Sequence, residues 1–99
     1  MFVHCVYFWL KPELDPVEKQ TFLKGLDDLT KIHSVRYGWY GMPAATNRPV
    51  IDRTYSYGLV VVFDNEAGHD AYQVDPVHTN FRVGLKDVWT NVRIHDFET

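Results

Sequence analysis

The side chains best suited to chemistry in this sequence are a phenol and an imidazole, Tyr72 and His78, which flank the dipeptide Asp75-Pro76. Proline fixes its own φ angle and disfavours helical geometry in the residue before it, so the dipeptide predicts a helix break. The same pair is typical of a new helix start, with Asp75 as N-cap and Pro76 in the first helical position. Tyr72 should therefore close one short helix and His78 should lie in the first turn of the next. Both could face one space as a pair of neutral groups that pass protons.

Hydrophobic patterning predicts the elements that must position this pair. Runs rich in β-branched and aromatic residues predict four strands: Phe2–Leu10, Val35–Met42, Tyr55–Phe63 and Asn91–Phe97. The segment Asp15-Pro16-Val17-Glu18 is typical of a helix start, and a buried stripe follows it at Phe22, Leu26 and Leu29, with Leu23 beside them. A second helical element starts at Asp64-Asn65, breaks at Asp75-Pro76 and continues to about Asp87.

The order of these elements is βαββαβ, which indicates an α+β fold of the ferredoxin-like type with a four-stranded antiparallel sheet. The strands Phe2–Leu10 and Tyr55–Phe63 are the most continuously apolar, so we expect them in the centre of the sheet. The other two strands carry charged residues, as edge strands do. No linker or internal repeat is visible, and we expect residues 1–99 to form a single domain.

Composition narrows the classes of partner. The 99 residues are 45% hydrophobic and 15% aromatic, and the formal net charge is −3. An acidic balance gives no reason to expect nucleic acid or an anionic membrane as a partner, and no apolar run is long enough to span a bilayer. The single cysteine, Cys5, excludes an internal disulfide framework and suits a reducing compartment. We therefore expect a cytoplasmic protein without membrane or nucleic-acid partners.

Alternation along the strands predicts the assembly. Neighbouring residues of a strand face opposite sides of the sheet, and two helical elements can cover only one side. That side should carry His4, Leu59 and Val61. The uncovered side would then expose an apolar set, Val3, Tyr7, Trp9, Val60 and Val62. A patch of this size predicts a homodimer that packs these faces together, although scattered exposed hydrophobic residues are also normal in monomers.

Several segments together resemble the stress-responsive dimeric α/β-barrel (Dabb) domain family over nearly the whole chain. They are Val3–Pro12, Tyr55–Phe63, Asp75-Pro76-Val77-His78-Thr79-Asn80-Phe81 and Asp96-Phe97. The family often has His-Pro-x-His where this chain has Asp75-Pro76-Val77-His78. The resemblance implies a ferredoxin-like protomer and a homodimer whose two sheets meet as a barrel.

The resemblance also implies a site. One plant enzyme of the family cyclises a linear tetraketide to olivetolic acid, and its catalytic tyrosine and histidine fall on Tyr72 and His78. Its pocket histidine on the first strand falls on His4, a third catalytic candidate here. Its pocket between sheet and helices would here bind a small, largely apolar oxygenated molecule. The lining residues would be Val6, Phe8, Phe22, Leu23, Leu26, Leu59, Val61, Phe81, Val92 and Ile94. An imidazole can remove a proton next to a ketone and a phenol can hydrogen-bond the enolate, so no cofactor is expected.

Other interpretations stay open. His78 could be a histidine bonded to the backbone at a helix start, Tyr72 a core aromatic and His4 a satisfied core histidine, in a non-catalytic stress-linked module. A third possibility is a small cofactor-free or haem-degrading monooxygenase on the same barrel. No metal site is predicted, because no histidine pair has the spacing of a zinc site and His33, His69 and His95 are expected at the surface.

Overall fold

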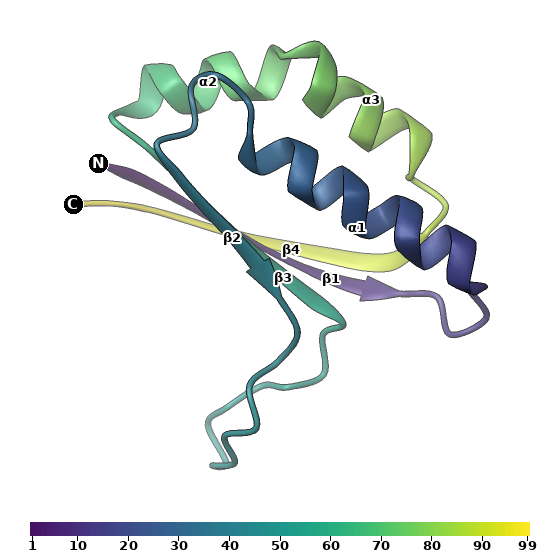
Figure 1. Ribbon diagram of the computed structural model, residues 1–99. Helices are drawn as coiled ribbons and strands as arrows, with labels where there is room; N and C mark the ends of the chain where they lie inside the picture. Colours follow the sequence, from purple (N-terminus) through teal and green to yellow (C-terminus); the bar gives the residue numbers. More distant parts are fainter.

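A computed structural model describes residues 1–99 as one four-stranded antiparallel sheet with three helices (Figure 1). The elements are β1 (Phe2–Leu10), α1 (Pro16–Thr30), β2 (Tyr37–Gly41), β3 (Tyr57–Phe63), α2 (Glu66–Val74), α3 (Pro76–Gly84) and β4 (Trp89–Glu98). The strand order is β2-β3-β1-β4. This is the predicted ferredoxin-like arrangement, and the central places of β1 and β3 are confirmed. None of the helices is long and apolar enough to cross a membrane.

The elements differ from the prediction only at their ends. β2 begins at Tyr37 rather than Val35, β3 at Tyr57 rather than Tyr55 and β4 at Trp89 rather than Asn91, while α3 ends at Gly84 rather than near Asp87. Val35 stays out of β2 because its backbone N–H donates to the Ile32 carbonyl at 2.9 Å, in the turn that follows α1. β4 is longer because Trp89 pairs with Leu10 beyond a register shift in the ladder.

Two aspartates cap the start of α1 and the junction between α2 and α3. Asp15 opens α1 with a capping box: its carboxylate accepts from the Glu18 backbone N–H at 2.8 Å, and its own N–H donates to the Glu18 side chain at 3.1 Å. Asp75 closes α2 and opens α3. Its N–H donates to the Tyr72 carbonyl at 3.2 Å and its carboxylate accepts from the Val77 N–H at 2.8 Å. The predicted break at Asp75-Pro76 is therefore confirmed.

The core lies between the sheet and the helices. On β1 the residues Phe2, His4, Val6 and Phe8 are buried, while their neighbours on the opposite face are half-buried. From α1 the predicted stripe of Phe22, Leu26 and Leu29 is buried against them. The alternation expected from the sequence thus assigns each side chain to the correct face.

The opposite face of the sheet carries no helix, and the segment between β2 and β3 extends away from the helices (Figure 1). The strand register aligns the side chains of this open face in rows across the sheet. One row is Tyr37–Val62–Val3–Phe97 and the next is Trp39–Val60–Cys5–His95. The open face is therefore an apolar band that crosses all four strands.

Candidate functional site

A pocket of about 180 Å³ lies between the sheet and the kinked α2–α3 pair. Nine of its lining residues belong to the predicted set: His4, Val6, Phe8, Leu59, Tyr72, His78, Phe81, Val92 and Ile94. Four further lining residues were not predicted: Leu29, Gln73, Arg82 and Trp89. Val92 and Ile94 are 38% and 52% exposed, so they form the open edge of the pocket along β4.

Four residues predicted to line the pocket do not contact it. Phe22, Leu26 and Val61 are completely buried, because they fill the packed core. Leu23 is half-buried and packs against the edge of that core. The apolar stripe of α1 predicted burial correctly, but it could not separate core from pocket wall.

Aromatic rings fill one end of the interior. Phe8 contacts Phe22, Phe81 and Trp89, with ring centroids 5.2, 5.9 and 5.3 Å apart, and Phe81 stacks on Trp89 at 5.7 Å. These rings close the space around the N-terminal half of α1. The pocket is the part of the interior that this aromatic cluster leaves open, next to Tyr72 and His78.

Tyr72 and His78 lie together on opposite sides of the helix break, with ring centroids 4.8 Å apart and an interplanar angle of 62°. Tyr72 is 1% exposed, and no protein group hydrogen-bonds its hydroxyl. The Nδ1 atom of His78 is buried and also has no hydrogen-bond partner. Most buried polar atoms have a partner, and of the two buried side-chain atoms that lack one here, Ser34 Oγ and His78 Nδ1, only the second belongs to a residue that lines the pocket.

Burial keeps both groups neutral. It lowers the pKa of His78, with smaller contributions in the same direction from His4, Arg82 and His69. Burial also raises the pKa of the Tyr72 hydroxyl. At neutral pH the pair therefore consists of an unprotonated imidazole, which accepts a proton, and a protonated phenol, which donates a hydrogen bond.

His4 lies on the wall of the same pocket and is 3% exposed, the one buried polar residue of the chain. Its Nδ1 atom donates to the Asp96 carboxylate at 2.5 Å, across the ladder in which His4 and Asp96 are direct partners. Its ring centroid is 5.8 Å from that of Tyr72. Burial lowers the pKa of His4 in spite of the opposing contact with Asp96. The carboxylate therefore fixes the proton on Nδ1 and leaves Nε2 as the acceptor.

His69 departs from the prediction that it lies at the surface, whereas His33 and His95 are exposed as expected. The His69 side chain is 17% exposed, because its ring stacks on Phe2 with centroids 4.4 Å apart. Its centroid is 5.2 Å from that of His4. The spacing of three residues from Tyr72 to His69 is the sequence signal for this placement, since it puts both on one helix face.

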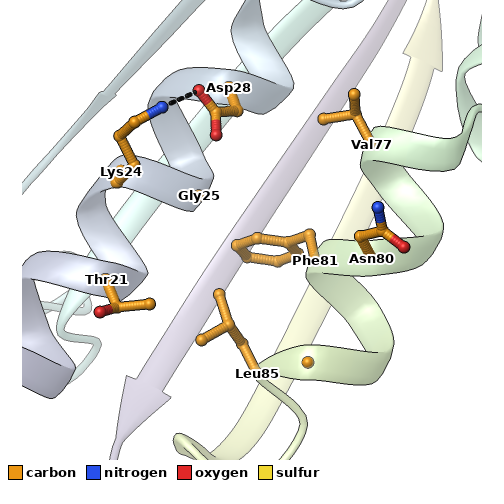
Figure 2. Close-up of a pocket in the computed structure, with 9 residues that line it drawn as sticks. Thr21, Lys24, Gly25, Asp28, Val77, Asn80, Phe81 and Leu85 are labelled. Carbon is orange, nitrogen blue, oxygen red and sulfur yellow. Dashed lines mark hydrogen bonds and ion pairs between the residues drawn. The ribbon is translucent and has the colours of Figure 1, made fainter.

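A second hollow, of about 380 Å³, lies between α1 and α3 and is shown in Figure 2. Its polar wall includes the exposed ion pair of Lys24 and Asp28, joined at 2.7 Å. No histidine, cysteine or tyrosine lines it. It is larger than the pocket at Tyr72, but its titratable side chains, Lys24 and Asp28, are exposed and paired with each other, so the smaller pocket is the candidate functional site.

Comparison with known proteins places this geometry in a family. No curated protein matches the sequence significantly. One similar solved structure is a Dabb family protein with a ferredoxin-like fold from Mesorhizobium loti, which is 23% identical with a TM-score of 0.79 over 99% of this chain and 95% of that one. Another is a dimeric ferredoxin-like protein of unknown function from Thermobifida fusca, 20% identical with a TM-score of 0.78 over 99% of this chain and 90% of that one.

A third similar structure is a hydroxynitrile lyase from Passiflora edulis, 14% identical with a TM-score of 0.78 over 97% of this chain and 90% of that one. At these identities the three structures support the fold alone. The family is shown by the sequence: the family model of the stress-responsive A/B barrel domain matches residues 2–99. The chain therefore belongs to the stress-responsive A/B barrel domain (Dabb) family.

Proposed function

We propose that this protein is an acid–base catalyst of the lyase or cyclase type, acting on a small, largely apolar oxygenated molecule with His78 as base and Tyr72 as hydrogen-bond donor. The observation that carries the proposal is the placement of His78 and Tyr72 side by side in the lining of one pocket, with ring centroids 4.8 Å apart and no hydrogen-bond partner for the buried Nδ1 of His78. Most buried side-chain polar atoms have a hydrogen-bond partner, so the unpaired Nδ1 of His78 supports a role beyond packing.

The proposed reaction is the removal of one proton by His78 and its later return. The neutral imidazole of His78 takes a proton from a carbon next to a carbonyl group, or from the hydroxyl of a carbonyl adduct. The electron pair left behind forms an enolate in the first case. In the second case the electron pair of the oxygen forms the carbonyl double bond, while the bond from the same carbon to the leaving group breaks and the leaving group keeps that bond's electrons. The Tyr72 hydroxyl donates a hydrogen bond to the substrate oxygen, and the protonated His78 returns its proton to the product or the leaving group. The step requires no electron carrier.

The pocket suggests the size of the substrate. Pockets for drug-sized ligands measure about 300 to 1,000 Å³, whereas this pocket measures about 180 Å³. Most of its lining is apolar, with polar groups gathered at Tyr72, His78 and the His4–Asp96 pair. These features favour a compact ketone or carbonyl adduct over a long polyketide chain. The Passiflora edulis protein of the same fold is a hydroxynitrile lyase, so hydroxynitriles are the first class to test here.

We also propose that the protein acts as a homodimer joined through its open sheet face. The rows of that face bring Tyr37, Val62, Val3 and Phe97 together, with Trp39 and Val60 beside them. Trp39 and Phe97 are 63% and 54% exposed in the protomer. Covering such an apolar band is favourable, and the Thermobifida fusca relative in fold is described as dimeric.

The experiment that tests catalysis compares the wild-type chain with His78→Gln, Tyr72→Phe and the surface control His33→Gln. Each is assayed for turnover of aromatic and aliphatic hydroxynitriles and of small enolisable ketones. We expect the two pocket variants to lose about 10²- to 10⁴-fold in kcat/KM, as removal of an acid–base group does. His33→Gln should keep the wild-type rate.

The alternative is a non-catalytic, stress-linked binding module with the same pocket. It would be favoured if the probes bind the wild-type chain without turnover. Turnover by His78→Gln at the wild-type rate would instead contradict the role of His78 as the base. Tyr72→Phe adds a second criterion. Because the hydroxyl has no partner, its removal should leave the melting temperature within about 2 °C of wild type, so a lost rate cannot be ascribed to unfolding.

A further inference from the structure

Three potential metal ligands converge beside the pocket from three different elements. They are His4 on β1, His69 on α2 and Asp96 on β4, and one ligand atom from each lies within 4.8 Å of the others. We propose that these residues form a binding site for a divalent transition-metal ion such as Zn²⁺. This inference goes beyond the proposed acid–base function, since the Tyr72–His78 pair requires no metal ion.

The ligand set suits such an ion. Two imidazole nitrogens and one carboxylate oxygen are typical of sites for zinc and its neighbours, at bond lengths of about 2.0 to 2.2 Å. Ligand atoms around a tetrahedral ion of this kind are about 3.3 Å apart. The side chains would therefore move inward by about 1 Å, and the His4–Asp96 contact would open to admit the ion. The His4 proton would then move from Nδ1 to Nε2, which frees the Nδ1 lone pair for the ion. Such a movement is small for side chains on adjacent elements.

The surroundings of His69 prepare it as a ligand. Its Nδ1 atom lies 3.1 Å from the Asp70 carboxylate, which accepts the Nδ1 proton and leaves a lone pair on Nε2. Nε2 is contacted at 3.1 Å by the amide nitrogen of Gln73. A metal ion needs to displace only this neutral amide. A carboxylate behind a ligating histidine is the usual outer support of metal sites, because it orients the ring and raises its basicity.

The His69 ring is held in place, and the site is open to solvent beside Asp96. Stacking on Phe2 and an edge contact with Phe63, with centroids 4.4 and 5.9 Å away, hold the His69 ring in place. The side chain of Asp96 is 37% exposed, so an ion can enter from solvent along β4. Three protein ligands leave at least one coordination position open. Because His4 also lines the pocket, that position adjoins the bound molecule.

Cobalt provides the test, because Co²⁺ bound to imidazole and carboxylate ligands absorbs visible light and Zn²⁺ displaces it. Binding is measured for the wild-type chain, His69→Gln, Asp96→Asn and two controls, His33→Gln and His95→Gln. His95 is a matched control, since it neighbours Asp96 on β4 but faces the opposite side of the sheet. We expect one Co²⁺ per chain, and a loss of at least about tenfold in affinity in each ligand variant but in neither control.

The proposal is overturned if Co²⁺ produces no ligand-field absorption, or if the control variants weaken binding as much as the ligand variants do. Circular dichroism of the metal-free variants verifies that they are folded, so that lost binding reports lost ligands. His78→Gln separates this inference from the proposed function. It should abolish turnover and leave Co²⁺ affinity unchanged, so each proposal can fail without the other.

Discussion

At the scale of single residues, the site depends on imidazoles that the fold holds away from water. His4 and His78 both have pKa values below the ordinary 6.5, and burial is the first cause in each case. His4 has a hydrogen-bond partner, Asp96, whereas the buried nitrogen of His78 has none. Asp96 therefore orients the ring of His4, whereas no hydrogen bond at Nδ1 orients the ring of His78.

These pKa shifts predict how stability depends on pH. In the unfolded chain an imidazole binds a proton below about pH 6.5, while the folded chain keeps these two histidines neutral to lower pH. Where the unfolded state binds more protons, stability falls as the pH falls. We expect the free energy of unfolding to be level above about pH 7 and to decrease as the pH falls below 6.5, measured by urea denaturation at a series of pH values.

The variant His78→Gln checks the assignment, because glutamine does not titrate. Its stability should decrease less steeply below pH 6.5 than that of the wild type. The exposed His33 is the comparison, and His33→Gln should keep the wild-type slope. A stability that rises on acidification, or a slope that His78→Gln leaves unchanged, would contradict a His78 imidazole that burial keeps neutral.

At the scale of elements, α1 and α3 approach closely because α1 carries Gly25 at their contact. A Cβ atom on Gly25 would lie 2.7 Å from Cδ2 of Phe81 and 3.0 Å from Cδ1 of Leu85. Figure 2 shows Phe81 extending from α3 toward α1 at this level. Phe81 also lines the candidate site, so the helix contact sets the position of one pocket wall.

Gly25→Ala should therefore destabilise the fold. Overpacking costs about 1 to 3 kcal/mol, and the better helix propensity of alanine returns up to about 1 kcal/mol. We expect a net loss of about 1 kcal/mol or more in the free energy of unfolding, measured by chemical denaturation. Gly84→Ala is the matched control, since a Cβ atom on Gly84 would meet no other atom within 4 Å. Equal stability of the two variants would show that Phe81 moves aside without cost.

Local signals explain why most elements could be predicted. Asp15 and Glu18 specify the start of α1 within four residues, and Asp75-Pro76 specifies the kink between α2 and α3 within two. Alternation on β1 assigned His4 to the helix side because a strand has a period of two. These rules need only near neighbours, so the sequence carries them directly.

The contents of the site were harder to predict where they depend on packing between distant segments. The helical spacing of His69 and Tyr72 indicates their shared helix face, but the approach of His69 to His4 also depends on the packing of α2 against β1 and β3. Trp89 enters the pocket because β4 starts earlier than its apolar run indicates. Arg82 follows His78 by one helical turn, so its spacing alone would have placed it on the same face.

At the scale of the whole molecule, the sheet has two unequal faces. One is covered by three helices and contains the pocket. The other bears the aromatic and aliphatic rows and has no cover (Figure 1). Val62 lies inside the open-face row between Tyr37 and Val3, where its side chain is half-buried within the protomer. A charge at this position would be solvated in a monomer and buried in a dimer.

The variant Val62→Lys therefore distinguishes the two assemblies. Burying an unpaired ammonium group costs several kcal/mol, so in a dimer the substitution should shift the mass measured by sedimentation from two chains to one. The unfolding midpoint of the wild type, but not of this variant, should rise with protein concentration. Val83→Lys on α3, where the valine is 56% exposed, makes the same change on the helix side and should leave the dimer intact.

A wild-type chain that sediments as a monomer at high concentration would contradict dimerisation. A Val62→Lys chain that stays dimeric would locate the interface elsewhere than on the open face.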